Sequence, residues 1–187
     1  MPNMSSVSGL ASVLYINLIN ETSKVVNRQD LHDKYLGGTG VATMLMHEEF
    51  KEGTDALDPE SPIVLSIGPL AGIFPCCTKV VAMFRSPLTG EFGESHAGGR
   101  LAMAMRLAGY SSIVITGRAK RPVYLSIYNN DIAFKDASSI WGLSSTTDIG
   151  KILRNVEPSA GKRSIIRIGT AGENRIRSAN ANVDTYR

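Results

Sequence analysis

The chain repeats itself, and this repetition constrains its fold more than any other feature. The glycine pairs Gly37-Gly38 and Gly98-Gly99 occupy matching places in two successive stretches, each with a hairpin pattern before the pair and a helix and an apolar strand after it. The segment IVLSIG at 63–68 is echoed by IVITG at 113–117. Repeated units bury their apolar faces against one another. We therefore expect two related halves that share one architecture.

The first half shows the repeated order most clearly. Apolar and polar residues alternate over 13–19, and a polar turn at 20–24 leads back into VVN, which predicts a hairpin. Asp30 is expected to cap a short helix that ends at Tyr35, before the glycine pair. A second helix is predicted over 40–50 and a buried strand over 63–67.

The second half follows the same order, and a looser third round comes after it. Strands are predicted over 79–84 and 91–94 around the turn SPLTG at 86–90, followed by a helix after Gly98-Gly99 and a strand in SSIVITG. The third round predicts a hairpin over 123–135, a helix capped by Ser145 three residues before Asp148, and a strand over 164–169.

These elements define the fold class. Strands joined by short turns, with only a few short helices, predict an α+β protein. We expect two mixed or antiparallel sheets related by a pseudo-twofold internal duplication. The length of 187 residues suits one hydrophobic core and would be cramped for two, so residues 1–187 are interpreted as a single domain.

Composition excludes several classes of function. The net charge is only +3 and the Lys and Arg residues are scattered, which argues against a nucleic-acid surface. No apolar run approaches the roughly 20 residues that span a bilayer, and the first residues lack the pattern of a secretion signal. A cytoplasmic location is expected. The adjacent Cys76 and Cys77 fit neither a disulfide framework nor a CxxC metal site, and are interpreted as small buried residues.

The glycine pairs have two possible roles. A Gly-Gly at a helix N-terminus presents backbone N–H groups to an anion such as phosphate, and the helix dipole favours that charge. Such glycines can instead serve only a sharp turn or close packing. Two pairs at equivalent positions on one rim favour the anion site. The run Gly38-Thr39-Gly40 lacks the acidic ribose contact and the parallel βαβ order of a dinucleotide site.

Seven segments resemble, in order and spacing, the N-terminal domain of the aldehyde:ferredoxin oxidoreductase family. These segments are YLGGTGVA at 35–42, DPESPIVLSIGPLAG at 58–72, RSPLTG at 85–90, GG at 98–99, AGYSSIVITGRAKRPVYLSI at 108–127, DASSIWG at 136–142 and IGTAGEN at 168–174. The family consists of tungsten enzymes with a bis-pterin metal cofactor and a [4Fe–4S] cluster. The resemblance implies the fold of that domain, which is the base on which the tungstopterin rests.

The resemblance also implies cofactor-binding residues, but no catalytic ones. Lys79 stands where the family commonly has an arginine between cluster and pterin, and lysine keeps the charge without the planar fork. His96 falls where the family often has an asparagine near the Mg²⁺ that bridges the pterin phosphates, a contact expected through its main-chain carbonyl. Gly98 is expected to lie against the cofactor, and Arg187 matches an arginine that begins the segment lining the other pterin. Taken alone, Lys79 is typical of a solvated strand end and His96 of a turn.

Other residues of the shared segments are interpreted as structural. Asp58 is expected to cap a loop, Trp141 to fill a core, and Glu173 with Asn174 to form a turn around a buried charge. His32 and His47 show no partner pattern and are expected on helix surfaces.

The sequence lacks the CxxCxxxC cysteines of the family's cluster and the DxxGL motifs that hold its pterins. Since a cluster needs about four thiolates, we expect this chain alone to bind no cofactor and to be incomplete as an enzyme. The first hypothesis is the tungstopterin-supporting domain of an enzyme with tungsten or molybdenum that oxidises aldehydes to carboxylates. Electrons would pass through the cluster to ferredoxin or another carrier, with further domains or a partner subunit completing the site. The alternative is a stand-alone, truncated member without catalysis that binds a pterin, a phosphate ligand or a protein partner, the partner including a second copy of the chain in a homodimer.

Overall fold

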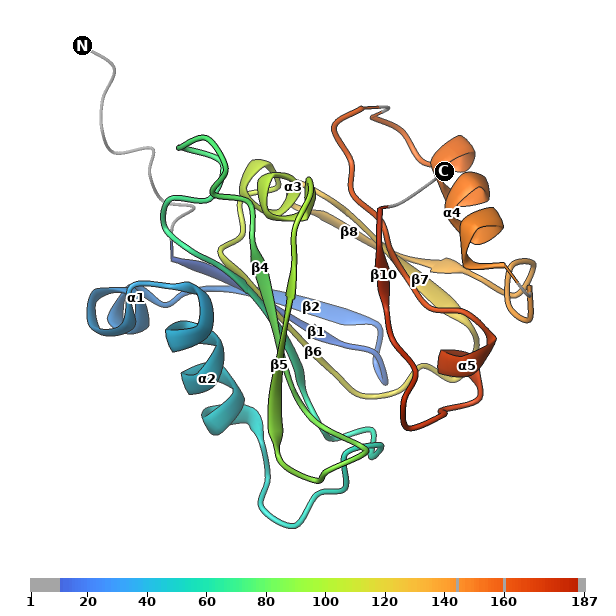
Figure 1. The fold of residues 1–187 in the computed structure, drawn as a ribbon, viewed down its shortest axis with the longest axis horizontal. Coiled ribbons are helices and arrows are strands. Elements are labelled where there is room, and N and C mark those ends of the chain that lie inside the picture. Colours follow the sequence, from blue (N-terminus) through green and yellow to red (C-terminus); the bar gives the residue numbers. More distant parts are fainter. Residues whose placement is uncertain (1–10, 144, 160, 185–187) are drawn as a thin grey trace.

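A six-stranded sheet forms the centre of the computed structural model, which describes residues 11–143, 145–159 and 161–184 (Figure 1). Its strands lie in the order β2-β1-β6-β3-β4-β5. Their bounds are β1 (Ser12–Asn17), β2 (Thr22–Asn27), β3 (Ile63–Ile67), β4 (Val80–Arg85), β5 (Phe92–Ala97) and β6 (Ser112–Thr116). The return strand β5 is thus longer than the predicted 91–94. Two further sheets have two strands each, so the α+β class with mixed and antiparallel sheets is confirmed.

The internal repeat is visible in the strand order. Exchanging the hairpin β1-β2 with β4-β5, and β3 with β6, gives the same order read from the opposite edge. Strand directions depart from this symmetry, because β1 runs parallel to β6 while β4 runs antiparallel to β3. The strands of both halves lie in one sheet, and the order of these strands obeys the internal repeat while their directions do not.

Helices cover both faces of the sheet. The helices α1 (Gln29–Tyr35) and α2 (Gly38–Glu49) pack on one face, where Val13, Val64 and Val114 point. The helix α3 (Leu101–Leu107) packs on the other face with the hairpin of β7 (Val123–Tyr128) and β8 (Asp131–Asp136), over Leu14 and Ile113. Neighbouring strand residues thus enter opposite cores, as the two-residue period requires.

The C-terminal segment from α4 onward packs outside the main sheet (Figure 1). It contains α4 (Thr146–Val156), β9 (Ile166–Arg167), α5 (Thr170–Glu173) and β10 (Asn182–Val183). The Ser145 side chain accepts from the amide of Asp148 at 3.2 Å, which confirms the predicted cap. The strand predicted over 164–169 is reduced to two residues, because β9 pairs only with the equally short β10.

One carboxylate joins α4 to the β7-β8 hairpin. Glu157, which directly follows α4, accepts hydrogen bonds from the Tyr124 and Ser126 hydroxyls at 2.8 Å and from the Lys135 ammonium at 2.7 Å. Its desolvation favours the neutral acid, but these three donors outweigh that effect and lower the pKa of Glu157. Charge-assisted bonds to one carboxylate therefore fix the third round of the repeat in place.

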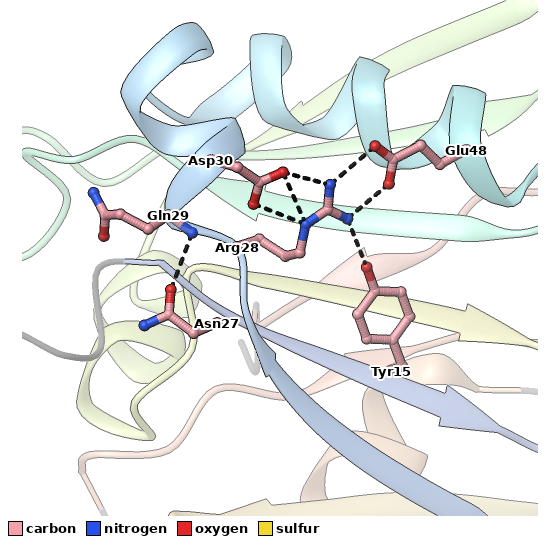
Figure 2. A network of polar contacts seen from close by, with 6 residues as sticks. All are labelled: Tyr15, Asn27, Arg28, Gln29, Asp30 and Glu48. Atoms are coloured by element: carbon pink, nitrogen blue, oxygen red, sulfur yellow. Dashed lines mark hydrogen bonds and ion pairs between the residues drawn. The ribbon is translucent and has the colours of Figure 1, made fainter.

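A cluster of polar side chains around Arg28 links the first hairpin to both helices that pack on the same face of the sheet (Figure 2). The Arg28 guanidinium donates to both carboxylate oxygens of Glu48, at 2.7 and 2.9 Å, and to Asp30 at 2.9 to 3.3 Å. It also donates to the Tyr15 hydroxyl at 3.3 Å. Arg28 itself holds the cap position of α1, so the prediction that Asp30 caps this helix was wrong. The carboxylate is engaged by the guanidinium instead.

Two single-residue predictions were wrong in opposite directions. His32 is buried at 9% exposure, and its Nε2 lies 3.1 Å from the Ser111 hydroxyl, whereas a surface position was expected. Trp141 is 47% exposed and does not fill a core. The exposed position of His47 is confirmed.

The other residues interpreted as structural hold loops through backbone groups. The Asp58 carboxylate accepts from the amide of Glu60 at 2.8 Å, as a loop cap should. Glu173 accepts from the amide of Gly142 at 3.0 and 3.1 Å, and the Asn174 side chain donates to the carbonyl of Thr170.

Candidate functional site

One cavity of about 360 Å³ brings the first glycine pair together with two of the residues singled out in the sequence. It lies between the start of α2, the loop that follows β3, the residues just before β4, and the edge strand β5. Gly38, Gly68, Lys79 and His96 line its wall. The cavity is therefore built from both halves of the repeat, although the sequence separates these residues widely.

The start of α2 forms one side of the cavity. Gly37 holds the cap position at φ 142° and ψ −171°, a region that only glycine adopts readily, and no side chain caps the helix. The helix begins at Gly38, which lines the cavity together with Thr39. The first N–H groups of a helix have no partner within it, and the helix dipole makes this end positive. This side of the cavity can therefore accept an anion.

The loop after β3 forms the next side, and Arg106 of α3 holds it. The guanidinium donates to the carbonyls of Ala71 at 3.1 Å, Gly68 at 3.2 Å and Pro69 at 2.8 Å. Burial lowers the pKa of Arg106 but leaves it a cation. A Cβ on Gly37 would lie 3.1 Å from both the Ile67 carbonyl oxygen and Pro69 Cδ, so helix and loop approach closely. Arg106 could not be recognised from the sequence, because no local pattern connects it to a loop more than 30 residues earlier.

Lys79 supplies the cation of the cavity. It directly precedes β4 and is exposed, and it makes no ion pair within the parts of the chain that the structure describes. A Cβ on Gly98 would lie 3.5 Å from the Lys79 ammonium nitrogen. Gly98 is not among the residues that line the cavity, but its lack of a side chain leaves room beside the Lys79 ammonium.

His96 lies on β5, at the outer edge of the sheet. Its side chain is 45% exposed, and its Nε2 is 3.5 Å from the Glu94 carboxylate. An edge strand leaves alternate backbone N–H and C=O groups without a partner in the sheet. Main-chain groups at this edge are therefore available to a ligand in the cavity.

The second glycine pair has different surroundings from the first. A Cβ on Gly99 would lie 3.8 Å from a carboxylate oxygen of Asp184. That carboxylate also accepts from the Ser164 hydroxyl at 2.7 Å and from the amide of Ile165 at 3.0 Å. The second pair thus lies beside a carboxylate and the first pair does not, so the surroundings of the two pairs differ. Gly38, with Lys79 close to Gly98, forms the anion-compatible part.

The prediction that Cys76 and Cys77 are small buried residues was wrong. Cys76 is exposed and Cys77 is partly buried, and both line the cavity as free thiols. Arg187, the remaining residue singled out in the sequence, lies outside the described residues. Within 11–143, 145–159 and 161–184, no group of three or more His, Cys, Asp or Glu side chains could hold a metal ion. Over the same ranges no helix has the length and apolar character needed to cross a bilayer.

The fold and sequence place the chain in a known family. Residues 13–187 match the family described as aldehyde ferredoxin oxidoreductase, N-terminal domain, and the chain belongs to this family. The tungsten-containing aldehyde ferredoxin oxidoreductase of Pyrococcus furiosus is 34% identical over 160 residues, which cover 85% of this chain and 26% of that protein. The corresponding enzyme of Pyrococcus abyssi is 33% identical, covering 89% of this chain and 28% of that protein.

Two further relatives carry other names. The aliphatic sulfonate oxidoreductase, WOR-like subunit, of Pyrococcus furiosus is 30% identical over 181 residues, covering 89% of this chain and 29% of that protein. Among solved structures, the active-site complex BamBC of benzoyl coenzyme A reductase with 1,5-dienoyl-CoA superposes with a TM-score of 0.85 at 26% identity, covering 95% of this chain and 27% of that one. The chain thus spans little more than a quarter of the length of these relatives.

Proposed function

We propose that this chain is the cofactor-supporting domain of a tungsten- or molybdenum-dependent oxidoreductase, with residues 1–187 acting as one unit. The observation that carries the proposal is one cavity whose lining includes both the start of α2, which no side chain caps, and Lys79. Membership of the family supports a bis-pterin metal cofactor as the ligand. Such a cofactor would supply the redox chemistry, while the protein supplies binding and electrostatics.

The residues of the cavity fit an anionic, phosphate-bearing group. Lys79 is an exposed cation without an ion pair among the described residues, and Gly38 and Thr39 at the start of α2 line the same cavity. Lysine binds phosphate as a point charge, so the loss of the family's arginine fork does not remove this contact. In this proposal Lys79 and the start of α2 would hold a phosphate of the cofactor, and the main-chain carbonyl of His96 would be a ligand for the Mg²⁺ that accompanies it. Arg187 would contact the second pterin.

The rest of the site would come from further protein. Electron transfer to ferredoxin or another carrier needs the [4Fe–4S] cluster, for which this sequence lacks the cysteines. A group of large apolar side chains beside the cavity is exposed, from the loop after β3 and from α3: Leu70, Ile73, Phe74, Met103 and Leu107. Apolar surface of this kind favours coverage by another domain or subunit. The relatives' greater length is consistent with such a completed assembly.

Oxidation of an aldehyde to a carboxylate is the reaction we propose for the complete enzyme, on the basis of the first two relatives. The names of the other relatives refer to an aliphatic sulfonate and a coenzyme A thioester. One domain therefore accompanies several substrates, which fits a role in holding the cofactor. Substrate choice would then be made by the remaining protein.

The test uses pyrophosphate as a probe for the cofactor's phosphates. It is titrated into the purified chain and followed by calorimetry and by amide chemical shifts. We expect shifts at Gly38 and at the residues around Lys79. Since a hydrogen bond to a charged group contributes about 1.5–3 kcal/mol, Lys79→Met should weaken binding by about tenfold or more.

Lys151→Met is the matched control, because Lys151 lies on α4 and, among the described residues, pairs only with Asp148 three residues away. It should leave pyrophosphate binding unchanged. Equal loss in both variants, or shifts confined to other surfaces, would contradict the proposal. Gly98→Val gives a second test, since its side chain would press on the Lys79 ammonium and should weaken binding without removing the charge.

A further inference from the structure

Two neighbouring cysteines line the same cavity, which is unusual for adjacent residues. In an extended segment, consecutive side chains point to opposite sides of the backbone. Here Cys76 adopts a left-handed conformation with φ 66°, and the amide of Thr78 donates to the carbonyl of Cys76 at 3.0 Å. The chain therefore turns tightly at Cys77. This turn lets both cysteines line the wall close to Lys79.

Both thiols are free and reachable. Neither forms a disulfide, Cys76 is exposed, and Cys77 is partly buried at the cavity wall. The amide of Gly72 donates to the carbonyl of Cys77 at 3.3 Å, and the amide of Cys77 donates to the carbonyl of Phe74 at 3.3 Å. These bonds tie the turn to the loop that Arg106 holds. The pair is thus presented by an anchored loop.

The number of ligands defines the chemistry that this pair can serve. Zinc takes about four protein ligands in a structural site, and no group of three or more suitable side chains exists among the described residues. Two thiolates satisfy a soft centre that needs only two sulfurs. A monosubstituted trivalent arsenical is such a centre. Its arsenic forms two As–S bonds while its oxygen leaves as water with the two thiol protons, and no oxidation state changes.

We propose that Cys76 and Cys77 form a paired-thiol site for thiophilic ligands of this class, on the wall of the cavity. The site does not depend on phosphate binding, so it can be tested separately from the function proposed above. A bound ligand would place its organic group in the cavity of about 360 Å³, beside the start of α2.

Phenylarsine oxide is the probe for this site. Intact mass and thiol titration of the folded chain should show one adduct per chain with the loss of both thiols. Cys76→Ser and Cys77→Ser each retain a single thiol, so they lose the second, intramolecular bond. Each should bind the probe about a hundredfold more weakly or worse. An adduct on one thiol only, or equal binding by the single-thiol variants, would overturn the proposal.

A second measurement locates the adduct and uses the unaltered chain, so it does not rely on the variants folding. Amide chemical shifts should change at Gly38 on α2 and at His96 on β5 when phenylarsine oxide binds. Both residues lie on the cavity wall but on other elements than the thiols. Changes confined to residues 73–79 would show that the thiols do not point into the cavity, and the proposal would fail. Zinc alone should produce no comparable change.

Discussion

Replacing Gly37 with alanine tests how closely the start of α2 approaches the loop after β3. The backbone of Gly37, at φ 142° and ψ −171°, lies in a region that costs a residue with a Cβ about 1–3 kcal/mol. The new Cβ would also stand 3.1 Å from the Ile67 carbonyl oxygen and from Pro69 Cδ. Overpacking of this kind costs about 1–3 kcal/mol. The free energy of unfolding should therefore fall by about 2–6 kcal/mol.

Gly53→Ala is the matched control for this variant. Gly53 also has a positive φ, +85°, but nothing lies within 4 Å of its Cβ position. Only the left-handed conformation is penalised there, at about 1–2 kcal/mol. The gain from restricting the unfolded chain is common to both variants and cancels in the comparison.

Equilibrium urea unfolding followed by far-UV circular dichroism measures both variants. The loss in Gly37→Ala should exceed the loss in Gly53→Ala by roughly 1–3 kcal/mol, which is the cost of overpacking that only Gly37→Ala carries. Amide exchange should also quicken at Gly68 in the Gly37 variant, because that loop must move. Equal losses in the two variants would refute the close approach, and with it the geometry of this wall of the cavity.

Three further predictions concern the groups that hold the fold. Burial and the hydrogen bond to Glu157 raise the pKa of Tyr124 from its usual 10.0 to about 12. The free energy of unfolding should therefore fall as pH rises between these two values. Tyr124→Phe should remove this fall in urea titrations, and its persistence would contradict the assignment. Arg28→Met should lower the free energy of unfolding by about 1–3 kcal/mol. Arg28→Lys should lose part of that amount, because an ammonium cannot bond both oxygens of Glu48 and reach Asp30 together. Equal stability of the lysine and arginine forms would argue against the network. Burial lowers the pKa of His32, so stability should decline as pH falls below about 6.5, and His32→Gln should flatten this decline.

Local patterns were sufficient to predict most elements. The β1-β2 and β7-β8 hairpins follow from alternation and turn residues, and the α4 cap follows from the Ser145 and Asp148 spacing. Such features depend on residues close in sequence. The repeated order also predicted that strands of both halves would be related, and this relation survives in the strand order of the sheet.

Features that depend on distant partners could not be predicted. His32 is buried because its ring contacts Ser111, 79 residues later in the sequence. Arg28 holds the cap position of α1 and engages the Asp30 carboxylate. This arrangement includes Glu48, 20 residues away, which also binds the guanidinium. Strand direction depends on how the connections pack. The structure therefore departs from the predicted pseudo-twofold symmetry, because β4 runs antiparallel to β3 whereas β1 runs parallel to β6. The thiols of Cys76 and Cys77 share a cavity only through a tight turn that their sequence does not reveal.

The most direct measurement is a crystal structure of this chain assembled with the protein that completes its site, with the metal cofactor bound. We expect a phosphate oxygen within about 3.2 Å of the Lys79 ammonium, beside the start of α2, with the pterin against Gly98. A cofactor bound elsewhere, for example over β2 and α2, or a cavity filled by the protein's own side chains, would contradict the account.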